Sequence, residues 1–105
     1  MKKILLISTG GTIASIQTDK GLEPGIDGKQ LINFIPQIGK MCKTDVVQLC
    51  NVDSTNVYYK HWLLIAKTIE ENYQSYDGFV ICHGTDTMSY TASALSYLIQ
   101  NSKKP

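Results

Sequence analysis

The stretch KILLISTGGT (residues 3–12) decides the fold of this chain. Its consecutive apolar residues Ile4–Ile7 are typical of a central strand that is covered on both faces of a parallel sheet. Gly10 and Gly11 then end the apolar run and allow the backbone to turn tightly. The sequence therefore predicts a buried strand over Lys3–Ser8 that delivers a glycine-threonine loop to one edge of a sheet.

Further strands and helices alternate after this first strand. Strands are predicted at Val46–Cys50 and Phe79–Cys82, because both runs are short, apolar and rich in strand-forming residues. Apolar stripes at helical spacing predict helices over Gly28–Gln37, Asn56–Tyr73 and Thr87–Gln100. Such a βαβ series predicts an α/β fold, a three-layer, doubly wound, mainly parallel and flavodoxin-like sheet.

One segment, residues 15–26, lacks an apolar period and contains Gly21, Pro24 and Gly25. It is expected to be a mobile loop directly after the first threonine motif, in the place of a lid. At the other end, Pro105 follows the last predicted helix, where a proline often introduces another strand. The sheet is therefore expected to be unfinished at this point.

The composition excludes several classes of function. The 105 residues carry a formal charge of +1 without a basic cluster, which argues against nucleic acid as a partner. The two neighbouring lysines at the end of the sequence, Lys103 and Lys104, are expected to be a solvated terminus. No apolar run approaches the length of a membrane span, so a cytoplasmic protein is expected. Cys42, Cys50 and Cys82 show no metal-binding or disulfide spacing, and because Cys50 and Cys82 lie at strand ends, buried free thiols are expected.

Hydroxyl-rich loops follow all the predicted strands and are therefore expected on the same edge of the sheet. Thr12 could be a nucleophile if a base takes its proton, or simply a threonine in a glycine turn. Asp53 and Ser54 could line the same crevice or cap the next helix, and Thr85 or Asp86 could likewise cap the last helix. His83 is expected to satisfy backbone groups rather than act as a base. Together the loops favour a site for a polar small molecule.

The two threonine motifs resemble the two signatures of the bacterial-type L-asparaginase/glutaminase family. These are Thr9-Gly10-Gly11-Thr12-Ile13-Ala14 and His83-Gly84-Thr85-Asp86-Thr87-Met88, with Asn51-Val52-Asp53-Ser54-Thr55 between them. The resemblance covers almost the whole chain and is nearest to the cytoplasmic, type I branch. It implies that residues 1–105 form the N-terminal part of the asparaginase catalytic domain.

The resemblance also implies a reaction, hydrolysis of L-asparagine to L-aspartate and ammonia through an acyl-enzyme. Thr12 matches the nucleophile, Thr85 and Asp86 match two members of a Thr-Asp-Lys triad, and Asp86 also lies near the substrate amine. Gly11 belongs to the nucleophile loop, whereas Asp53 and Ser54 match the substrate-binding segment. No cofactor is implied, L-glutamine stays open as a second substrate, and a homo-oligomer is expected.

The chain departs from the family pattern in three respects. The triad lysine is expected beyond Pro105, the second domain is missing, and Leu22 stands where many relatives have a lid tyrosine. The 105 residues alone are therefore expected to be inactive or nearly so. Two alternatives stay open: a non-catalytic module that self-associates, and a relative of the amidotransferases that act on charged tRNA. The latter normally has an additional N-terminal domain, whereas Met1 here directly precedes the first strand.

Overall fold

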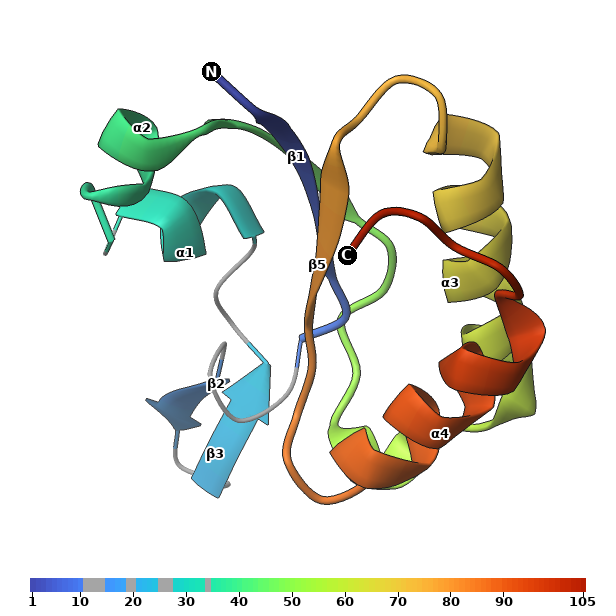
Figure 1. The fold of residues 1–105 in the computed structure, drawn as a ribbon. Coiled ribbons are helices and arrows are strands. Elements are labelled where there is room, and N and C mark those ends of the chain that lie inside the picture. The colour runs from blue at the N-terminus through green and yellow to red at the C-terminus, as the bar shows by residue number, and fades with distance from the viewer. Residues whose placement is uncertain (11–14, 19–20, 25–27, 34) are drawn as a thin grey trace.

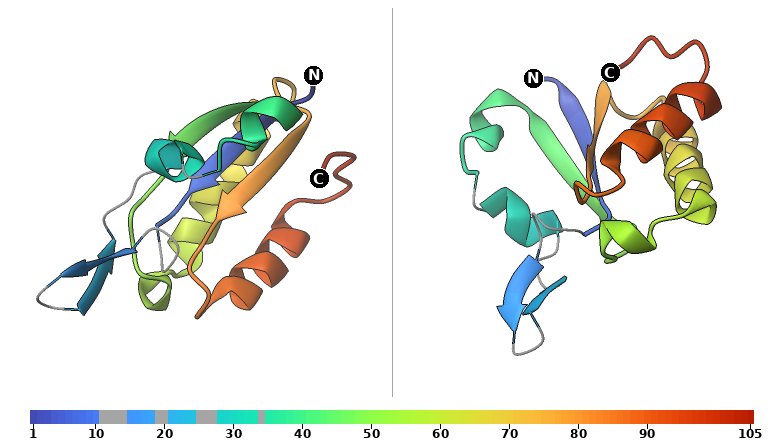
Figure 2. Two further views of the ribbon diagram at one scale, coloured as in Figure 1. Left: turned by 90° about the vertical axis from the view of Figure 1, so that its left-hand side faces the viewer. Right: turned by 90° about the horizontal axis from the view of Figure 1, so that it is seen from below.

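The computed structural model describes residues 1–10, 15–18, 21–24, 28–33 and 35–105. A three-stranded parallel sheet has the order β4-β1-β5, with β1 at Lys3–Ser8, β4 at Lys43–Gln48 and β5 at Gly78–Cys82. Helices α1 (Gly28–Asn33) and α2 (Ile38–Met41) lie on one side of this sheet, and α3 (Tyr59–Asn72) and α4 (Met88–Leu98) lie on the other (Figures 1 and 2). The prediction of an α/β fold with helices on both faces of a parallel sheet is confirmed.

The core lies between the sheet and the α3–α4 layer. Alternate residues of a strand point to opposite faces, so Leu5 and Ile7 of β1 share one face. They pack with Ile65 and Ile69 of α3, and these four side chains are at most 6% exposed. The apolar stripe of α3 is therefore core, as its helical spacing predicts.

The strand β4 begins three residues earlier than predicted and includes two charged residues. Its register pairs Lys3 with Lys43 and Ser8 with Gln48, so the ladder runs the whole length of β1. Asp45 is tolerated because β4 is an edge strand whose side chains reach solvent. Its carboxylate accepts a hydrogen bond from the Tyr76 hydroxyl at 2.8 Å and lies 3.3 Å from Lys3 Nζ.

The helix predicted over Gly28–Gln37 is confirmed only for Gly28–Asn33, and a second short helix begins just beyond the predicted range, so this prediction was wrong in its extent. Pro36 lies between α1 and α2, and a proline disfavours helical backbone at the residue before it, here Ile35. The prediction placed Pro36 at the weak end of one helix, whereas the chain stops its first helix at Asn33 and starts another at Ile38.

Residues 15–26, which were expected to be a loop, contain two strands. An antiparallel ladder joins β2 (Ser15–Thr18) and β3 (Gly21–Pro24) and pairs Ser15 with Pro24 and Thr18 with Gly21. The β-branched residues Ile16 and Thr18 favour strand backbone. The segment was nevertheless predicted to be a loop, because its glycines and proline are typical of loops. Leu22 belongs to β3, and whether this segment acts as a lid stays a prediction.

The two long helices are shorter than predicted. A 3-10 turn at Ser54–Asn56 precedes α3, and Thr87 occupies the N-cap position of α4, one residue after Asp86. The prediction that Thr85 or Asp86 caps α4 was therefore wrong. None of the helices in the described part of the chain is long and apolar enough to cross a membrane.

The expectation of a solvated terminus holds for the exposed Lys103 and is corrected for Lys104, which is half-buried against the domain. Lys104 Nζ donates hydrogen bonds to the carbonyls of Tyr73 and Tyr76, the latter at 2.9 Å, just beyond the last turn of α3. The Phe79 N–H on strand β5 donates to the Pro105 carbonyl at 2.9 Å. A cation at a helix C-terminus interacts favourably with the exposed carbonyls there.

Candidate active site

Thr9, directly after β1, bonds both to the end of β5 and to the loop that follows β4. Its N–H and its Oγ1 both donate to the carbonyl of Cys82, at 3.0 and 2.8 Å. Its own carbonyl accepts a hydrogen bond from the Val52 N–H at 2.9 Å. Because Thr9 is only 2% exposed, these bonds are shielded from water. The three loops that the sequence places at one edge of the sheet are thus held together there.

Gly10 continues this junction with a backbone conformation that other residues rarely adopt. Its φ is +90°, and a Cβ at this position would lie 2.6 Å from Asn51 Oδ1 and 2.9 Å from the Val52 nitrogen. Only glycine therefore fits both the backbone angle and the space. Gly10 lets the first loop approach the loop that follows β4 very closely.

The middle loop holds Asp53 and Ser54. The Asp53 carboxylate accepts hydrogen bonds from the N–H and the hydroxyl of Thr55, at 3.1 and 3.2 Å. The Asp53 carbonyl accepts from the Asn56 N–H, so this residue stabilises the 3-10 turn and not α3, whose N-cap is Tyr58. The capping interpretation thus holds for the turn and fails for the helix. Asp53 is exposed, and the backbone of Ser54 begins the turn.

The second signature loop leaves β5 and enters α4. Thr85 and Asp86 are both exposed, and the Thr85 carbonyl accepts the Met88 N–H at 3.4 Å. His83 is partly buried, and its Nδ1 lies 2.5 Å from the Gly84 carbonyl. This contact agrees with the expectation that His83 satisfies a backbone group.

Thr12 and Gly11 lie outside the described residues, so their predicted roles stay predictions. The structure does place Gly10, directly before them, against the Asn51-Val52 loop. The assignment of Asp53, Ser54, Thr85 and Asp86 to substrate binding or catalysis is likewise a prediction.

The cysteines near the junction, Cys50 and Cys82, are free thiols that are half-buried and not fully buried. Burial raises the pKa of both Cys50 and Cys82, which keeps them protonated at neutral pH. Cys50 Sγ lies 3.8 Å from the Thr9 carbonyl and points at the junction only as a weak donor. In the described ranges no three histidine, cysteine or acidic side chains gather in a way that could hold a metal ion.

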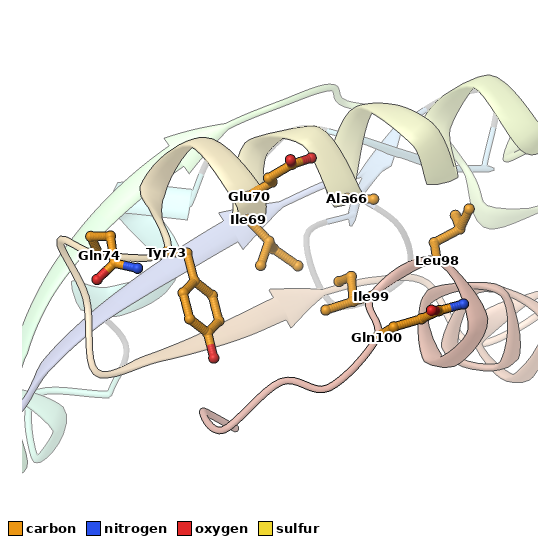
Figure 3. A pocket seen from close by; sticks show the side chains of 8 residues that line it. All are labelled: Ala66, Ile69, Glu70, Tyr73, Gln74, Leu98, Ile99 and Gln100. Carbon is orange, nitrogen blue, oxygen red and sulfur yellow. The ribbon is translucent and has the colours of Figure 1, made fainter.

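A pocket that is distinct from the signature loops lies elsewhere. A hollow of about 430 Å³ is bordered by the C-terminal half of α3 and the end of α4, as Figure 3 shows. Its lining residues are Ala66, Ile69, Glu70, Tyr73, Gln74, Leu98, Ile99 and Gln100. The loop at residues 51–55 precedes α3 and the loop at residues 83–86 precedes α4, so this pocket lies at the opposite end of the helical layer and is not the candidate site. Lys104, beside Tyr73, lies at that opposite end too.

Sequence reasoning missed two groups near the site. The motif alone gives Thr9 no role of its own, although Thr9 bonds to the end of β5 and to the loop that follows β4. The helical spacing assigns Trp62 to an apolar stripe, yet its indole Nε1–H donates to Thr91 Oγ1 at 2.8 Å. One sequence signal could have indicated this hydrogen bond. A tryptophan in an apolar stripe needs an acceptor for its indole N–H, and a threonine in the stripe of a neighbouring helix can supply one.

Known proteins share both the sequence and the fold of this chain. The family described as Asparaginase, N-terminal matches residues 3–105. An L-asparaginase from Thermococcus kodakarensis is 40% identical over 98% of this chain and 32% of its own length. A component of the glutamyl-tRNA(Gln) amidotransferase from Saccharolobus solfataricus is 37% identical over 98% of this chain and 24% of its own length.

Solved structures agree with these sequence matches. The thermostable L-asparaginase from Thermococcus kodakarensis superimposes with a TM-score of 0.74 at 36% identity, over 90% of this chain and 29% of that one. A structure described as "Probable Cytoplasmic L-asparaginase from Campylobacter jejuni" gives a TM-score of 0.80 at 38% identity, over 90% and 28%. The chain thus spans about a third or less of the length of these relatives. Its sequence and its parallel sheet together show that it belongs to the asparaginase family, of which it represents the N-terminal part.

Proposed function

We propose that this chain provides half of an L-asparaginase active site, by which we mean the nucleophile loop and the loop at residues 83–86. Water would hydrolyse the side-chain amide of L-asparagine to L-aspartate and ammonia. Thr12 Oγ attacks the amide carbon, ammonia leaves, and water then cleaves the resulting ester and frees the threonine. Thr85 and Asp86 serve proton transfer and substrate binding from the neighbouring loop, Asp53 and Ser54 bind the substrate from the middle loop, and Gly11 shapes the turn.

The observation that carries this proposal is the match of residues 3–105 to the asparaginase family, in which both threonine motifs lie. The hydrogen bonds of Thr9 to Cys82 and Val52 support it, because they hold the loops that bear the motifs at one sheet edge. Ligands bind at such an edge in open parallel sheets. We place the protein in the cytoplasm and expect a homo-oligomer, as the resemblance to the type I branch implies.

A chimera tests the proposal directly. Residues 3–105 would replace the matching segment of the Thermococcus kodakarensis L-asparaginase, which supplies the length that this chain does not contain. The chimera should release ammonia from L-asparagine, and Thr12→Ala should reduce the rate by orders of magnitude. Thr18→Ala is the matched control, because Thr18 lies nearby without matching the motif. Undiminished ammonia release by the Thr12→Ala chimera would refute the role of Thr12.

The 105 residues alone are proposed to be inactive, because they span about a third of the relative's length. A purified chain that turned over L-asparagine at about 1–1000 per second would contradict this statement.

An amidotransferase component is a second candidate, because those relatives are nearly as similar as the L-asparaginase, at 37% against 40% identity. The two functions differ in the fate of the ammonia. An asparaginase releases it, whereas an amidotransferase passes it to a glutamate carried on tRNA. Ammonia that appears in solution without any tRNA favours the first, and tRNA-dependent consumption of the amide favours the second.

A further inference from the structure

A chain of hydrogen bonds connects α3, α4 and the loop that follows β5. Trp62 Nε1 lies 2.8 Å from Thr91 Oγ1, and the same oxygen lies 2.9 Å from His83 Nε2. The other ring nitrogen of His83, Nδ1, lies 2.5 Å from the Gly84 carbonyl. Gly84 directly precedes Thr85 and Asp86, so the last bond of the chain acts on the backbone of the proposed catalytic loop.

For a neutral imidazole ring, chemistry fixes the direction of every hydrogen bond in this series. The indole N–H can only donate, so Thr91 Oγ1 accepts from Trp62. The Gly84 carbonyl can only accept, so His83 Nδ1 carries the hydrogen and donates. In a neutral imidazole Nε2 is then an acceptor, and the Thr91 hydroxyl donates to it. One ring tautomer, protonated at Nδ1, satisfies all three bonds.

Thr91, at the helical end of this hydrogen-bond series, is buried, whereas a hollow lies beside the ring of His83. Thr91 is 3% exposed, and both Thr91 and Trp62 lie on the two long helices. A hollow of about 120 Å³ borders His83, lined also by Ile81, Met88, Thr91, Ala92 and Leu95. Because there is room beside the ring, its orientation depends on the hydrogen bonds.

We propose that Trp62 and Thr91 are positioning residues that act through His83 and hold the carbonyl of Gly84, and with it the loop at residues 83–86, in place. This inference rests on the proposed function of Thr85 and Asp86. Loops that carry reacting groups must be held within about 0.5 Å of their productive geometry. A hydrogen-bonded histidine anchored on two helices supplies such a constraint next to Thr85 and Asp86, which are themselves exposed.

The tautomer of His83 tests the first part of this proposal, and it can be measured on the 105-residue polypeptide itself. The chain has two histidines, His61 and His83, so histidine labelled with ¹⁵N in the ring gives few signals, which His83→Gln assigns. His83 should be protonated at Nδ1. Thr91→Val should shift the ring toward the other tautomer, and Thr91→Ser, which keeps a hydroxyl, should restore it. A ring that is protonated at Nε2, or that samples both tautomers equally, would overturn the proposal.

Kinetics of the chimera test the second part. Thr91→Val should lower kcat by about tenfold or more, because misplacement of reacting groups by about 1 Å costs up to a hundredfold. The KM of Thr91→Val should change far less than its kcat. Trp62→Phe should also lower kcat. Thr91→Ser, which keeps the hydroxyl, should retain most of the parent kcat. Thr68→Val is the matched control, since it removes a hydroxyl that bonds to the Leu64 carbonyl within α3.

Unchanged kcat in Thr91→Val, or an equal loss in Thr68→Val, would overturn the positioning role. A chimera that does not hydrolyse L-asparagine at all would instead count against the proposed function. The tautomer measurement does not depend on activity and would still decide whether the hydrogen-bond chain exists.

Discussion

Replacement of Gly10 by alanine is expected to destabilise the domain strongly. The backbone at Gly10 has a φ of +90°, a region that costs an L-residue about 1–2 kcal/mol. The new Cβ would also lie 2.6 Å from Asn51 Oδ1 and 2.9 Å from the Val52 nitrogen, closer than Cβ contacts normally are. Such overpacking costs about 1–3 kcal/mol, so Gly10→Ala should lower the free energy of unfolding by about 2–5 kcal/mol.

Urea unfolding followed by circular dichroism measures this change, and Gly39→Ala provides the control. Gly39 lies in α2, and a Cβ there would meet nothing within 4 Å. Gly39→Ala should therefore be neutral or stabilising by up to about 1 kcal/mol, because alanine favours the helix. In a domain of this size the loss at Gly10 corresponds to a fall in Tm of about 10 °C or more. A Gly10→Ala variant within about 0.5 kcal/mol of the parent would refute the close packing of the two loops.

Three further substitutions test features on both sides of the sheet. Ser8→Ala should leave stability unchanged or raise it by about 1 kcal/mol in urea unfolding, because Ser8 Oγ is buried without a hydrogen-bond partner among the described residues; a clear loss would show that the hydroxyl is satisfied. Asp77→Asn should make the stability of the domain less sensitive to acid. The backbone N–H of Lys3 donates to the Asp77 carboxylate and holds its pKa below the ordinary 3.8. The folded state is therefore stabilised by this carboxylate above about pH 4, and the stabilisation is lost as pH falls through the folded pKa. The stability difference between parent and variant should thus shrink below about pH 4, and a constant difference would contradict the shift. Lys104→Met should lower Tm by a few degrees, because it removes two hydrogen bonds to carbonyls beyond α3, and an unchanged Tm would mean that this contact is weak in solution.

The sequence predicted the alternation of strands and helices well, because the signals were local. The apolar run of β1 and the stripe of α3 depend only on spacing, and both were found close to their observed places. Element ends were less predictable. β4 begins at Lys43 because pairing with β1 extends it through Asp45, and no local signal in a charged segment reports that pairing.

The site was predictable as a set of loops but not as a set of contacts. Motifs named Thr12, Thr85 and Asp86, whereas the bonds of Thr9 to Cys82 and Val52 join residues more than 40 positions apart. The same holds for the contact between Trp62 and Thr91, which are 29 positions apart. Such pairs arise only when the sheet and its helices have packed.

The register of the sheet is what makes these distant loops meet. Ser8 pairs with Gln48 on one side and with Cys82 on the other, so all three strands end level and their loops leave the sheet together. A slip of one residue in either ladder would shift a loop by about 3.3 Å and turn its side chains to the other face. A catalytic arrangement tolerates about 0.5 Å, so a single slip would separate the proposed nucleophile loop from its partners. Thr9 opposes such a slip on the β5 side, because its N–H and its Oγ1 both donate to the carbonyl of Cys82, the residue that pairs with Ser8 at the end of that ladder. The threonine that begins the first motif therefore contributes to the site by fixing the register, and the threonine three residues later is the one for which we propose the chemistry.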